Sequence, residues 1–349
     1  MSGNPIKPST WAAGIVALAA AGFIGHMLPS TGTAPEQPAA SAQPAKQAKS
    51  ESPTPKAVAP AQETAAPART TEATSASYTP PAESDIPKGP FGDMVRLGEA
   101  IFHDTQHNAK GFVGNDLQCA NCHIDRGRQP NSAPLGAAYL LYPAYRSKNG
   151  HVNTFQERLQ GCFRFSMNGK APPFNDKVLV ALETYAYFLA RGGPTGVAVE
   201  GQGYPKLKAP GQPADYDRGA KVYAQHCALC HGAGGEGQKS ADGQTVFPPL
   251  WGPRSFNWGA GMGSINNAAG FIKANMPLGL GGTLSDQDAW DVATYMDSQE
   301  RPQDPRFVDS VAETRKRFHD EPTSKYGLVV NGVLLGEKSP PSGTINTMD

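Results

Sequence analysis

The sequence has no excess of either charge and little charge altogether. Its 31 basic and 31 acidic residues give a formal net charge of zero, and 18% of its 349 residues are charged. A chain without a basic excess has no electrostatic footprint for a polyanion, so we expect no nucleic-acid partner. The low charge, together with 39 glycines and 32 prolines, is typical of small loop-rich domains wrapped around a cofactor, with an unfolded segment attached.

Cysteine is also scarce, and four of the five cysteines belong to one motif that occurs twice. The motif is C-x-x-C-H, in which two thiols bond to the vinyl groups of a haem and the adjacent histidine lies under the iron. Zinc would need four ligands at each cluster, and a thioredoxin-like dithiol would need a βαβ context; neither is present. The sequence predicts two covalently bound haem c groups, attached through Cys119, Cys122 and His123 and through Cys227, Cys230 and His231.

Each motif lies between two helical patterns. The first motif follows a helix with Gly98 and Phe102 and precedes an amphipathic helix over 178–191. The second follows Gly219 and Tyr223, and precedes a similar helix over 286–299. A glycine lets two helices cross closely while aromatic side chains fill the contact. The repeated pattern predicts two tandem class I cytochrome c domains.

We therefore expect an all-α fold with the first cytochrome domain at 87–205 and the second at 206–302. A Gly/Pro-rich stretch joins them. The remaining tail, 303–349, contains a helical pattern over 308–319 and an extended piece over 328–335. We expect this tail to pack on the haem domains.

One long apolar run lies at the N-terminus. Residues 11–28 carry no charge apart from a possible one on His26, and the run is about as long as a short membrane-spanning helix. It is longer than the apolar core of a signal peptide, and no convincing A-x-A cleavage site follows it. We expect residues 1–28 to anchor the chain in the inner membrane, with a cleaved signal as the alternative. Either interpretation places the remainder in the periplasm.

Residues 29–86 consist almost entirely of Pro, Ala, Ser, Thr, Gln, Glu and Lys, with Tyr78 as the single aromatic. Such a segment cannot bury enough apolar area to offset the entropy lost on ordering. It predicts a disordered Pro/Ala-rich tether, long enough to let the cytochrome domains range away from the membrane.

The sixth ligands of the two irons decide the redox potentials and the access of substrate. In the second domain the candidate is Met276, which lies 45 residues after His231 and precedes Pro277. Met262, in a glycine-rich stretch, is the weaker alternative. A His/Met haem of relatively high potential follows from Met276.

The first domain offers two candidates. Met167 lies 44 residues after His123, which nearly repeats the spacing of Met276. Five residues earlier lies Cys162, the one cysteine outside the motifs. An unpaired cysteine in an exported protein is an inert buried thiol, an intermolecular disulfide, or a reactive or ligating group. Spacing alone leaves both Cys162 and Met167 open.

Local charge favours chemistry on an anion in the first domain. Between residues 126 and 170 one acid, Glu157, stands against seven basic residues, which are Arg126, Arg128, Arg146, Lys148, Arg158, Arg164 and Lys170. Arg158 lies four residues before Cys162, so a helix would present both on one face, and the guanidinium would favour the thiolate. The second domain, 215–300, carries nine acids against five basic residues. We expect it to meet a redox partner.

The stretch ERLQGCFRFSMNGK at 157–170, with the Asn-Met-Pro sequence at 275–277, resembles the thiosulfate dehydrogenase family of dihaem cytochromes c. The resemblance implies His/Cys ligation of the first haem, by His123 and Cys162, and His/Met ligation of the second, by His231 and Met276. It also implies active-site roles for Arg158 and Ser166, and less directly for Arg146.

Members of this family join two thiosulfates into tetrathionate and release two electrons, some of them reversibly. The resemblance implies a redox partner such as a c-type cytochrome, a high-potential iron–sulfur protein or a terminal oxidase. Some members carry Lys before the methionine, where this chain has Asn275. We therefore expect no lysine-to-methionine ligand switch.

Two other interpretations remain. In one, the chain is a membrane-tethered dihaem electron shuttle without substrate chemistry, with Met167 as the ligand and Cys162 structural. In the other, it is a different sulfur-oxidising cytochrome with cysteine ligation, which would work within a multi-subunit assembly. The sixth ligand of the first haem separates the shuttle from the enzyme.

Overall fold

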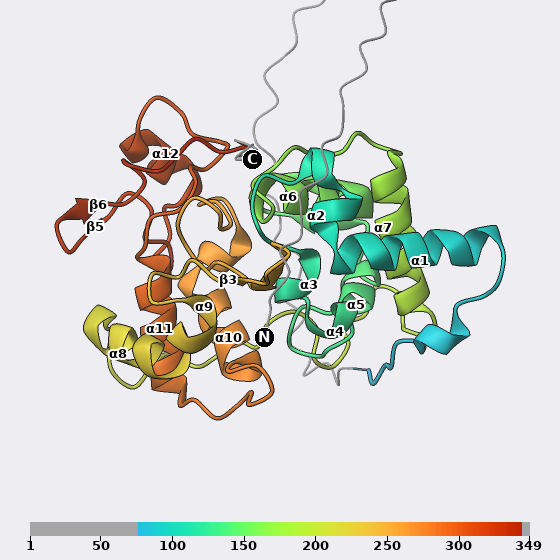
Figure 1. Cartoon of the computed structure of the whole chain (residues 1–349), viewed down its shortest axis with the longest axis horizontal. Helices are drawn as coiled ribbons and strands as arrows, with labels where there is room; N and C mark the ends of the chain where they lie inside the picture. Colours follow the sequence, from blue (N-terminus) through green and yellow to red (C-terminus); the bar gives the residue numbers. More distant parts are fainter. Residues whose placement is uncertain (1–75, 344–349) are drawn as a thin grey trace, which may run out of the picture. The chain divides into compact units, whose positions relative to one another are not determined.

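The computed structural model describes residues 76–343, which are mainly helical (Figure 1). The helices of the first half are η1 (Glu83–Asp85), α1 (Pro90–His103), α2 (Thr105–Asn108), η2 (Lys110–Phe112), α3 (Cys119–Cys122), α4 (Ile124–Gly127), α5 (Leu135–Tyr139), α6 (Phe155–Phe165) and α7 (Lys177–Ala190). Those of the second half and tail are α8 (Tyr216–His226), α9 (Ala228–His231), η3 (Gly261–Gly263), α10 (Ile265–Asn275), α11 (Asp286–Asp297) and α12 (Val311–Phe318).

Three short antiparallel ribbons accompany the helices. Their strands are β1 (Ala144–Arg146) with β2 (His151–Asn153), β3 (Gln238–Lys239) with β4 (Thr245–Phe247), and β5 (Val329–Val330) with β6 (Val333–Leu334). The expected helical content is confirmed, and the ribbons are additions to the all-α expectation. None of them forms a core layer, because each has two strands of two or three residues.

Side-chain caps explain where most of the longer helices begin. A polar side chain accepts a hydrogen bond from a free N–H in the first turn of α6, α7, α8, α11 and α12. These caps are Thr154, Asp176, Asp215, Ser285 and Ser310. Helix α1 instead begins with Pro90, whose fixed φ suits the first helical position.

In each half the first long helix crosses the last one at a glycine. A Cβ on Gly98 of α1 would lie 2.1 Å from the carbonyl oxygen of Ala181 in α7, and one on Gly219 of α8 would lie 2.0 Å from that of Asp291 in α11. Figure 1 shows α1 crossing α7 in this way. The two crossings have the same construction, which agrees with a duplicated cytochrome domain.

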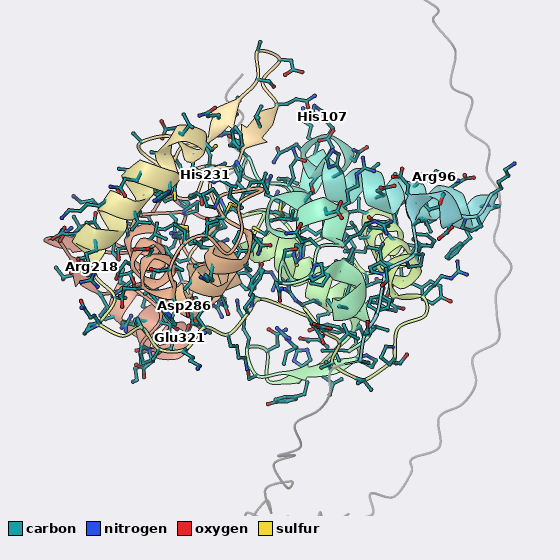
Figure 2. The ribbon with its side chains drawn as sticks, turned by 90° about the horizontal axis from the view of Figure 1, so that it is seen from below. Arg96, His107, Arg218, His231, Asp286 and Glu321 are labelled. Carbon is teal, nitrogen blue, oxygen red and sulfur yellow. The ribbon has the colours of Figure 1, made fainter. Side chains whose placement is uncertain are left out.

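Each crossing supports its own hydrophobic core. The first core contains the fully buried Val95, Tyr185 and Phe188, and the second contains Val292 and Ala293. In the second half Arg218, which Figure 2 labels near the start of α8, also pairs with the buried carboxylate of Asp291; Nε lies 2.7 Å from Oδ2.

The tail packs against the second half of the molecule. Tyr326 lies edge to face against Trp258, with ring centroids 5.5 Å apart, and the indole N–H of Trp258 donates to Ser339. His319, at the end of α12, binds the fully buried carboxylate of Asp304 at 2.8 Å. Ring packing and the hydrogen bond to Ser339 therefore hold the tail against the second half, and the His319–Asp304 pair joins two parts of the tail itself.

The last residues of the predicted tether, 76–86, pack on the first domain. Ala76 pairs with Val199, Tyr78 packs with Leu140 and its neighbours, and Arg128 donates to the carbonyl of Pro81. The expectation of disorder is wrong for this stretch, because one aromatic ring and a guanidinium supply contacts that the polar composition does not suggest.

The predicted anchor, 1–28, and the rest of the tether lie outside the described residues. Within residues 76–343, no helix is long and apolar enough to cross a membrane.

We expect Gly98→Ala to destabilise the fold, because the added methyl group would overlap the backbone of α7. Overpacking of this kind costs about 1–3 kcal/mol, although alanine is the better helix former. Gly161→Ala in α6 is the matched control, since its Cβ would meet only Arg158 Nη1 at 4.0 Å. Urea unfolding of the holoprotein measures both. Equal stabilities for the two variants would contradict the close crossing.

Candidate haem and substrate site

The histidine of each motif is oriented by a backbone carbonyl. Nδ1 of His123 lies 2.7 Å from the carbonyl oxygen of Ala133, and Nδ1 of His231 lies 2.9 Å from that of Pro248. A carbonyl only accepts, so Nδ1 carries the proton and Nε2 is left with a free lone pair. Burial lowers the pKa of both imidazoles, which favours this neutral form. Both rings are prepared to bind a metal through Nε2.

A cavity of about 380 Å³ adjoins the first motif. The structure brings together there the predicted residues Cys119, Cys122, His123, Arg146, Arg158, Cys162, Ser166 and Met167. Both candidate sixth ligands of the first haem therefore face the same cavity. Met167 is almost fully buried, whereas Cys162 is half-buried.

A second cavity, of about 200 Å³, adjoins the second motif. It is lined by Cys227, Cys230, His231 and Met276, as the sequence predicts. Met262, the weaker alternative to Met276, lines both cavities.

The two cavities fit haem c in their donor sets. Each combines two thiols, a histidine with a free Nε2 and a sulfur-containing side chain from another element, within largely apolar walls. In the part of the chain that the structure describes, no group of three or more His, Cys, Asp and Glu side chains could hold a bare metal ion. A porphyrin supplies four nitrogens of its own, so haem needs no such group.

Helix α6 and its C-cap residue, Ser166, present three of the predicted residues in one row. Arg158, Cys162 and Ser166 follow one another at intervals of four residues, so they share a face of the helix. Phe155, Leu159 and Phe163 lie on the strip of the helix beside this row, and they line the same cavity. They are buried in the first core and fix the rotation of the helix, which keeps the polar row at the wall of the cavity.

The row contains a close contact between a cation and a thiol. Nη1 of Arg158 lies 2.9 Å from Sγ of Cys162. The negative charge that Cys162 can carry raises the pKa of Arg158 above its usual value. The guanidinium of Arg158 therefore donates a hydrogen bond to the sulfur of Cys162 at the wall of the cavity.

Two buried asparagines hold the end of α6. Asn115 donates to the carbonyls of Ser166 (2.8 Å) and Ser255 (3.1 Å). Asn257 donates to the carbonyl of Arg164 (2.9 Å) and to the side chain of Asn168 (3.0 Å). Residues of the second half thus help to position the helix that carries Cys162.

The basic residues counted in the sequence do not all face this site. Arg146 and Arg158 line the first cavity, whereas Arg126 binds Glu83 and Glu99 on another surface. Lys148 lies 4.0 Å from the ring centroid of Phe165 and donates to a backbone carbonyl. Its burial, with the nearby charge of Arg306, lowers its pKa to about 8. The count of basic residues along the sequence is therefore larger than the number of cations that line the cavity.

Sequence reasoning missed two tyrosines of the first cavity, Tyr142 and Tyr204. Burial raises the pKa of both phenols, which therefore stay protonated and can donate hydrogen bonds. Neither lies in a motif. Tyr204 belongs to the Gly/Pro-rich linker, where nothing in the sequence distinguishes it from a packing residue.

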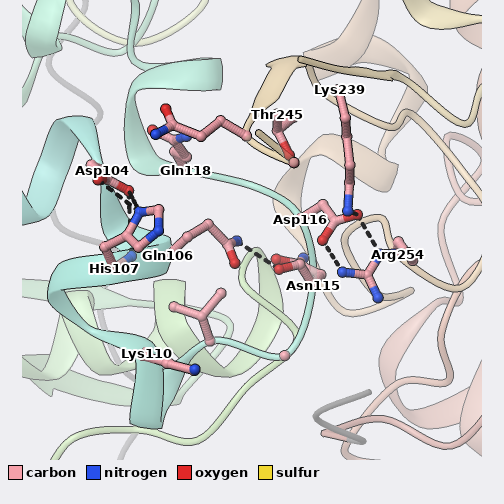
Figure 3. Close-up of a pocket in the computed structure, with 14 residues that line it drawn as sticks. Asp104, Gln106, His107, Lys110, Asn115, Asp116, Gln118, Lys239, Thr245 and Arg254 are labelled. Carbon is pink, nitrogen blue, oxygen red and sulfur yellow. Dashed lines mark hydrogen bonds and ion pairs between the residues drawn. The ribbon is translucent and has the colours of Figure 1, made fainter. Parts of the chain in front are cut away.

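A third cavity, of about 290 Å³, is lined by no residue of either haem motif, although Gln118 lines both it and the first cavity (Figure 3). At its wall the carboxylate of Asp116 binds both Arg254 and Lys239, the latter at 2.9 Å. His107 faces Asp104 in the same cavity. Because Asp116 of the first half binds Arg254 and Lys239 of the second half, the wall of the third cavity is a polar seam between the two halves.

Comparison with known proteins identifies the family. A family model described as cytochrome c oxidase, cbb3-type, subunit III matches residues 214–296. Thiosulfate dehydrogenase of Thiomonas intermedia (strain K12) is 62% identical over 268 residues, which cover 77% of this chain and 85% of that protein. This chain belongs to the thiosulfate dehydrogenase family. The member from Stutzerimonas stutzeri (strain A1501) is 52% identical, over 76% of this chain and 87% of that protein.

A solved structure of the thiosulfate dehydrogenase family agrees with the fold. It is the thiosulfate dehydrogenase (TsdBA) from Marichromatium purpuratum in its as-isolated form, with a TM-score of 0.71 at 52% identity. The match covers 75% of this chain and 57% of that chain, so this chain spans less than two thirds of the solved one. The resemblance carried by residues 157–170 is confirmed, and the cytochrome match implies haem c.

We expect Asp116→Asn to weaken the seam, since it removes the charge shared by Arg254 and Lys239. Burial alone would raise the pKa of Asp116, but its two cationic partners hold the pKa below its usual value. The stabilisation is therefore present above about pH 4 and is lost as the pH falls through the folded pKa. Loss of roughly 1–3 kcal/mol is expected at neutral pH.

Urea unfolding of the holoprotein at pH 7 and at lower pH measures this effect. Asp242→Asn is the control, because Asp242 is exposed and bonds only Ser240 and the backbone nearby. If Asp116→Asn and Asp242→Asn cost the same at pH 7, the ion cluster does not hold the seam.

Proposed function

We propose that this chain oxidises two thiosulfates to tetrathionate in the first cavity and passes the two electrons through the second haem site to an external acceptor. The observation that carries the proposal is the 2.9 Å contact between Arg158 and Cys162, in the cavity that contains the first haem-attachment motif. Membership of the thiosulfate dehydrogenase family, at 62% identity to one member, supports the substrate.

The charges of the cavity suit this substrate. Thiosulfate is a dianion, and two of them must approach each other closely before a sulfur–sulfur bond can form. Their repulsion rises steeply in a partly desolvated site unless fixed cations offset it. Arg146 and Arg158 line the cavity and supply that charge, and the hydroxyl of Ser166 adds a hydrogen-bond donor.

Cys162 is the proposed sulfur nucleophile. Its thiolate would bond to the terminal sulfur of one thiosulfate, giving a cysteine S-thiosulfonate and two electrons. A second thiosulfate would then attack the sulfur that bears the sulfonate, so that tetrathionate leaves and the thiolate of Cys162 returns. No proton is consumed or released. Arg158, beside Sγ, stabilises the thiolate at both steps.

Two haem c groups would be held by the two motifs, with His123 and Cys162 at the first iron and His231 and Met276 at the second. Such groups supply one-electron redox chemistry, and two of them match the two electrons released. An anionic sulfur donor lowers a haem potential, whereas a methionine raises it. The proposed ligands therefore favour electron flow from the first site to the second.

The surface around the second cavity suits the exit of electrons. Val246 and Leu278 line this cavity and are also exposed, and Leu229, between the two motif cysteines, is 87% exposed. Leu280 is exposed as well. We infer that Leu229, Val246, Leu278 and Leu280 form one contact surface, which we name the exit patch. Apolar exposure of this kind marks a contact surface, and the acidic balance of residues 215–300 favours a redox partner with a basic face.

The competing function is that of a dihaem electron shuttle without substrate chemistry. The shuttle remains an alternative because Met167 also lines the first cavity and could ligate the first iron. An uncleaved N-terminal anchor and a periplasmic location, as the sequence predicts, would suit either function.

We expect Cys162→Ala to keep both haems attached, abolish thiosulfate–tetrathionate interconversion and raise the potential of the first haem, since an anionic donor is lost. Met167→Leu nearly conserves volume and should cost little by comparison. Steady-state kinetics, haem content and electron paramagnetic resonance of the oxidised protein measure these effects. Thiolate ligation of low-spin ferric haem compresses the g-tensor, and this signature should vanish in Cys162→Ala.

Arg158→Gln separates substrate binding from ligation, because it removes charge from the cavity without removing a ligand. It should weaken thiosulfate use while leaving the haem spectrum almost unchanged. If Met167→Leu alters the spectrum of the first haem while Cys162→Ala leaves the haem spectrum and thiosulfate oxidation intact, the chain is an electron shuttle and the proposed enzyme function is wrong.

We expect electron transfer to a basic cytochrome c acceptor to slow as ionic strength rises, since salt screens the steering charges. Leu280→Ser should raise KM for the acceptor and leave KM for thiosulfate unchanged. Val329→Ser is the control, because Val329 is comparably exposed on the tail ribbon β5–β6. If neither the salt concentration nor Leu280→Ser changes the rate of electron transfer to the acceptor, the exit patch is not the contact surface for that acceptor.

A further inference from the structure

Asn275, the residue before Met276, is buried and held by residues of the first half of the molecule. Its side-chain oxygen accepts a hydrogen bond from Gln129 Nε2 at 3.0 Å. Its amide nitrogen donates to the carbonyls of Asn131 and Phe271, both at 3.0 Å. Only 2% of Asn275 is exposed, and both of its donors are used. We name Gln129, Asn131 and Asn275 the clasp.

The first-half side of the clasp is a firmly held segment, 129–133. The N–H groups of Asn131 and Ala133 donate to the carbonyls of Gly201 and Gly203, at 2.6 and 2.8 Å. Ser132 is fully buried, and its hydroxyl donates to the carbonyl of Gln129 at 2.8 Å. A segment with this many internal and linker contacts can serve as a rigid support.

The same segment supports the histidine of the first motif. Its last residue, Ala133, supplies the carbonyl that fixes Nδ1 of His123 at 2.7 Å. One end of the segment therefore orients the axial histidine of the first haem site, and the other end holds the neighbour of Met276. The two sites share a single backbone support.

We propose that Gln129 and Asn131 are positioning residues, which hold Met276 in place as a ligand of the second haem by binding Asn275 from the first domain. This inference rests on the proposed ligation of the second iron by Met276. Met276 lies at the end of α10, where its N–H donates to the carbonyl of Ile272 at 2.8 Å, and glycine-rich backbone follows at 279–282. The helix orients Met276 from one side, and the clasp fixes its neighbour from the other.

Loss of the clasp has a defined chemical consequence. Without Gln129 the buried oxygen of Asn275 loses its one side-chain partner, and a buried polar group without a partner drives local rearrangement. A thioether is a weak neutral donor, so a small displacement is enough to weaken its bond to iron. Because methionine ligation raises a haem potential, weaker ligation should lower it.

The experiment compares Gln129→Leu with Asn266→Leu in the full-length holoprotein. Asn266 lies on α10 as Asn275 does, but is exposed and bonds only Ser264. Spectroelectrochemical titration gives the midpoint potential of each haem, and the methionine-to-iron charge-transfer absorption reports the bond itself. Gln129→Leu should weaken this absorption and lower the potential of the second haem, whereas Asn266→Leu should change neither.

A double-mutant cycle with Asn275→Ala tests the pair directly. If Gln129 acts through Asn275, the two changes shift the potential of the second haem by less together than the sum of their separate shifts. Should Asn275→Ala fail to retain both haems, Gln129→Leu alone decides, because Gln129 is only half-buried and its replacement leaves the core intact.

The outcomes separate this inference from the proposed function. If the unaltered protein shows the methionine absorption, and Gln129→Leu leaves that absorption and the potential unchanged, the clasp is overturned and the function stands. If the unaltered protein lacks the methionine absorption, Met276 is not the ligand and both the ligand assignment and the clasp fail. Thiosulfate oxidation by the Cys162→Ala variant is measured separately, and it tests the proposed role of Cys162 in either case.

Discussion

The close crossing of the first and last helices in each half is the constraint on which the rest of the molecule depends. Gly98 and Gly219 allow backbone to meet backbone, and an aromatic residue one turn later then reaches the haem motif. The ring of Phe102 lies 5.8 Å from that of His123, and the hydroxyl of Tyr223 donates to the carbonyl of Gly232, next to His231. The crossing therefore helps to decide where His123 and His231 lie, and each histidine lines one of the two cavities.

Buried amides join the two halves. Asn115 reaches from the first half to Ser255, Asn257 reaches from the second half to the end of α6, and Asn275 reaches back to Asn131. A buried amide must satisfy donors and an acceptor together, so each of these contacts specifies one arrangement of the halves. The polar seam at Asp116 adds charge to the same junction. The end of α6, the helix that carries Cys162, is thus held in part by the second half.

The two cavities differ in the charge and the chemical type of their side chains. The first combines Arg146 and Arg158 with a thiol, an arrangement suited to anions that are brought together and oxidised. The second has a thioether and an exposed apolar rim within an acidic domain, which suits contact with another protein. Leu117, Cys122 and Met262 line both cavities, so the two cavities adjoin.

Short-range chemistry could be predicted from the sequence. The two C-x-x-C-H motifs, the glycine and aromatic pairs and the spacing of Arg158 and Cys162 each involve residues within one or two helical turns, where chain geometry fixes what can meet. The helices over 177–190 and 286–297 lie within two residues of their predicted ends, and the family is confirmed. The spacing of four residues also predicted that Arg158 and Cys162 would share a helix face, whereas Ser166 was implied by the family resemblance alone.

Contacts between distant segments were decided only by the tertiary structure. The count of basic residues did not reveal that Arg126 turns away to Glu83 and Glu99, because a charge density along the chain carries no direction. The order in residues 76–86, the tyrosines of the first cavity and the hydrogen bonds of Asn275 to Gln129 and Asn131 all depend on surfaces that exist only after folding. The sequence by itself determined the cofactor chemistry and the helical plan, since these follow from local spacing; the shape and charge of the site needed the fold, since they follow from long-range packing.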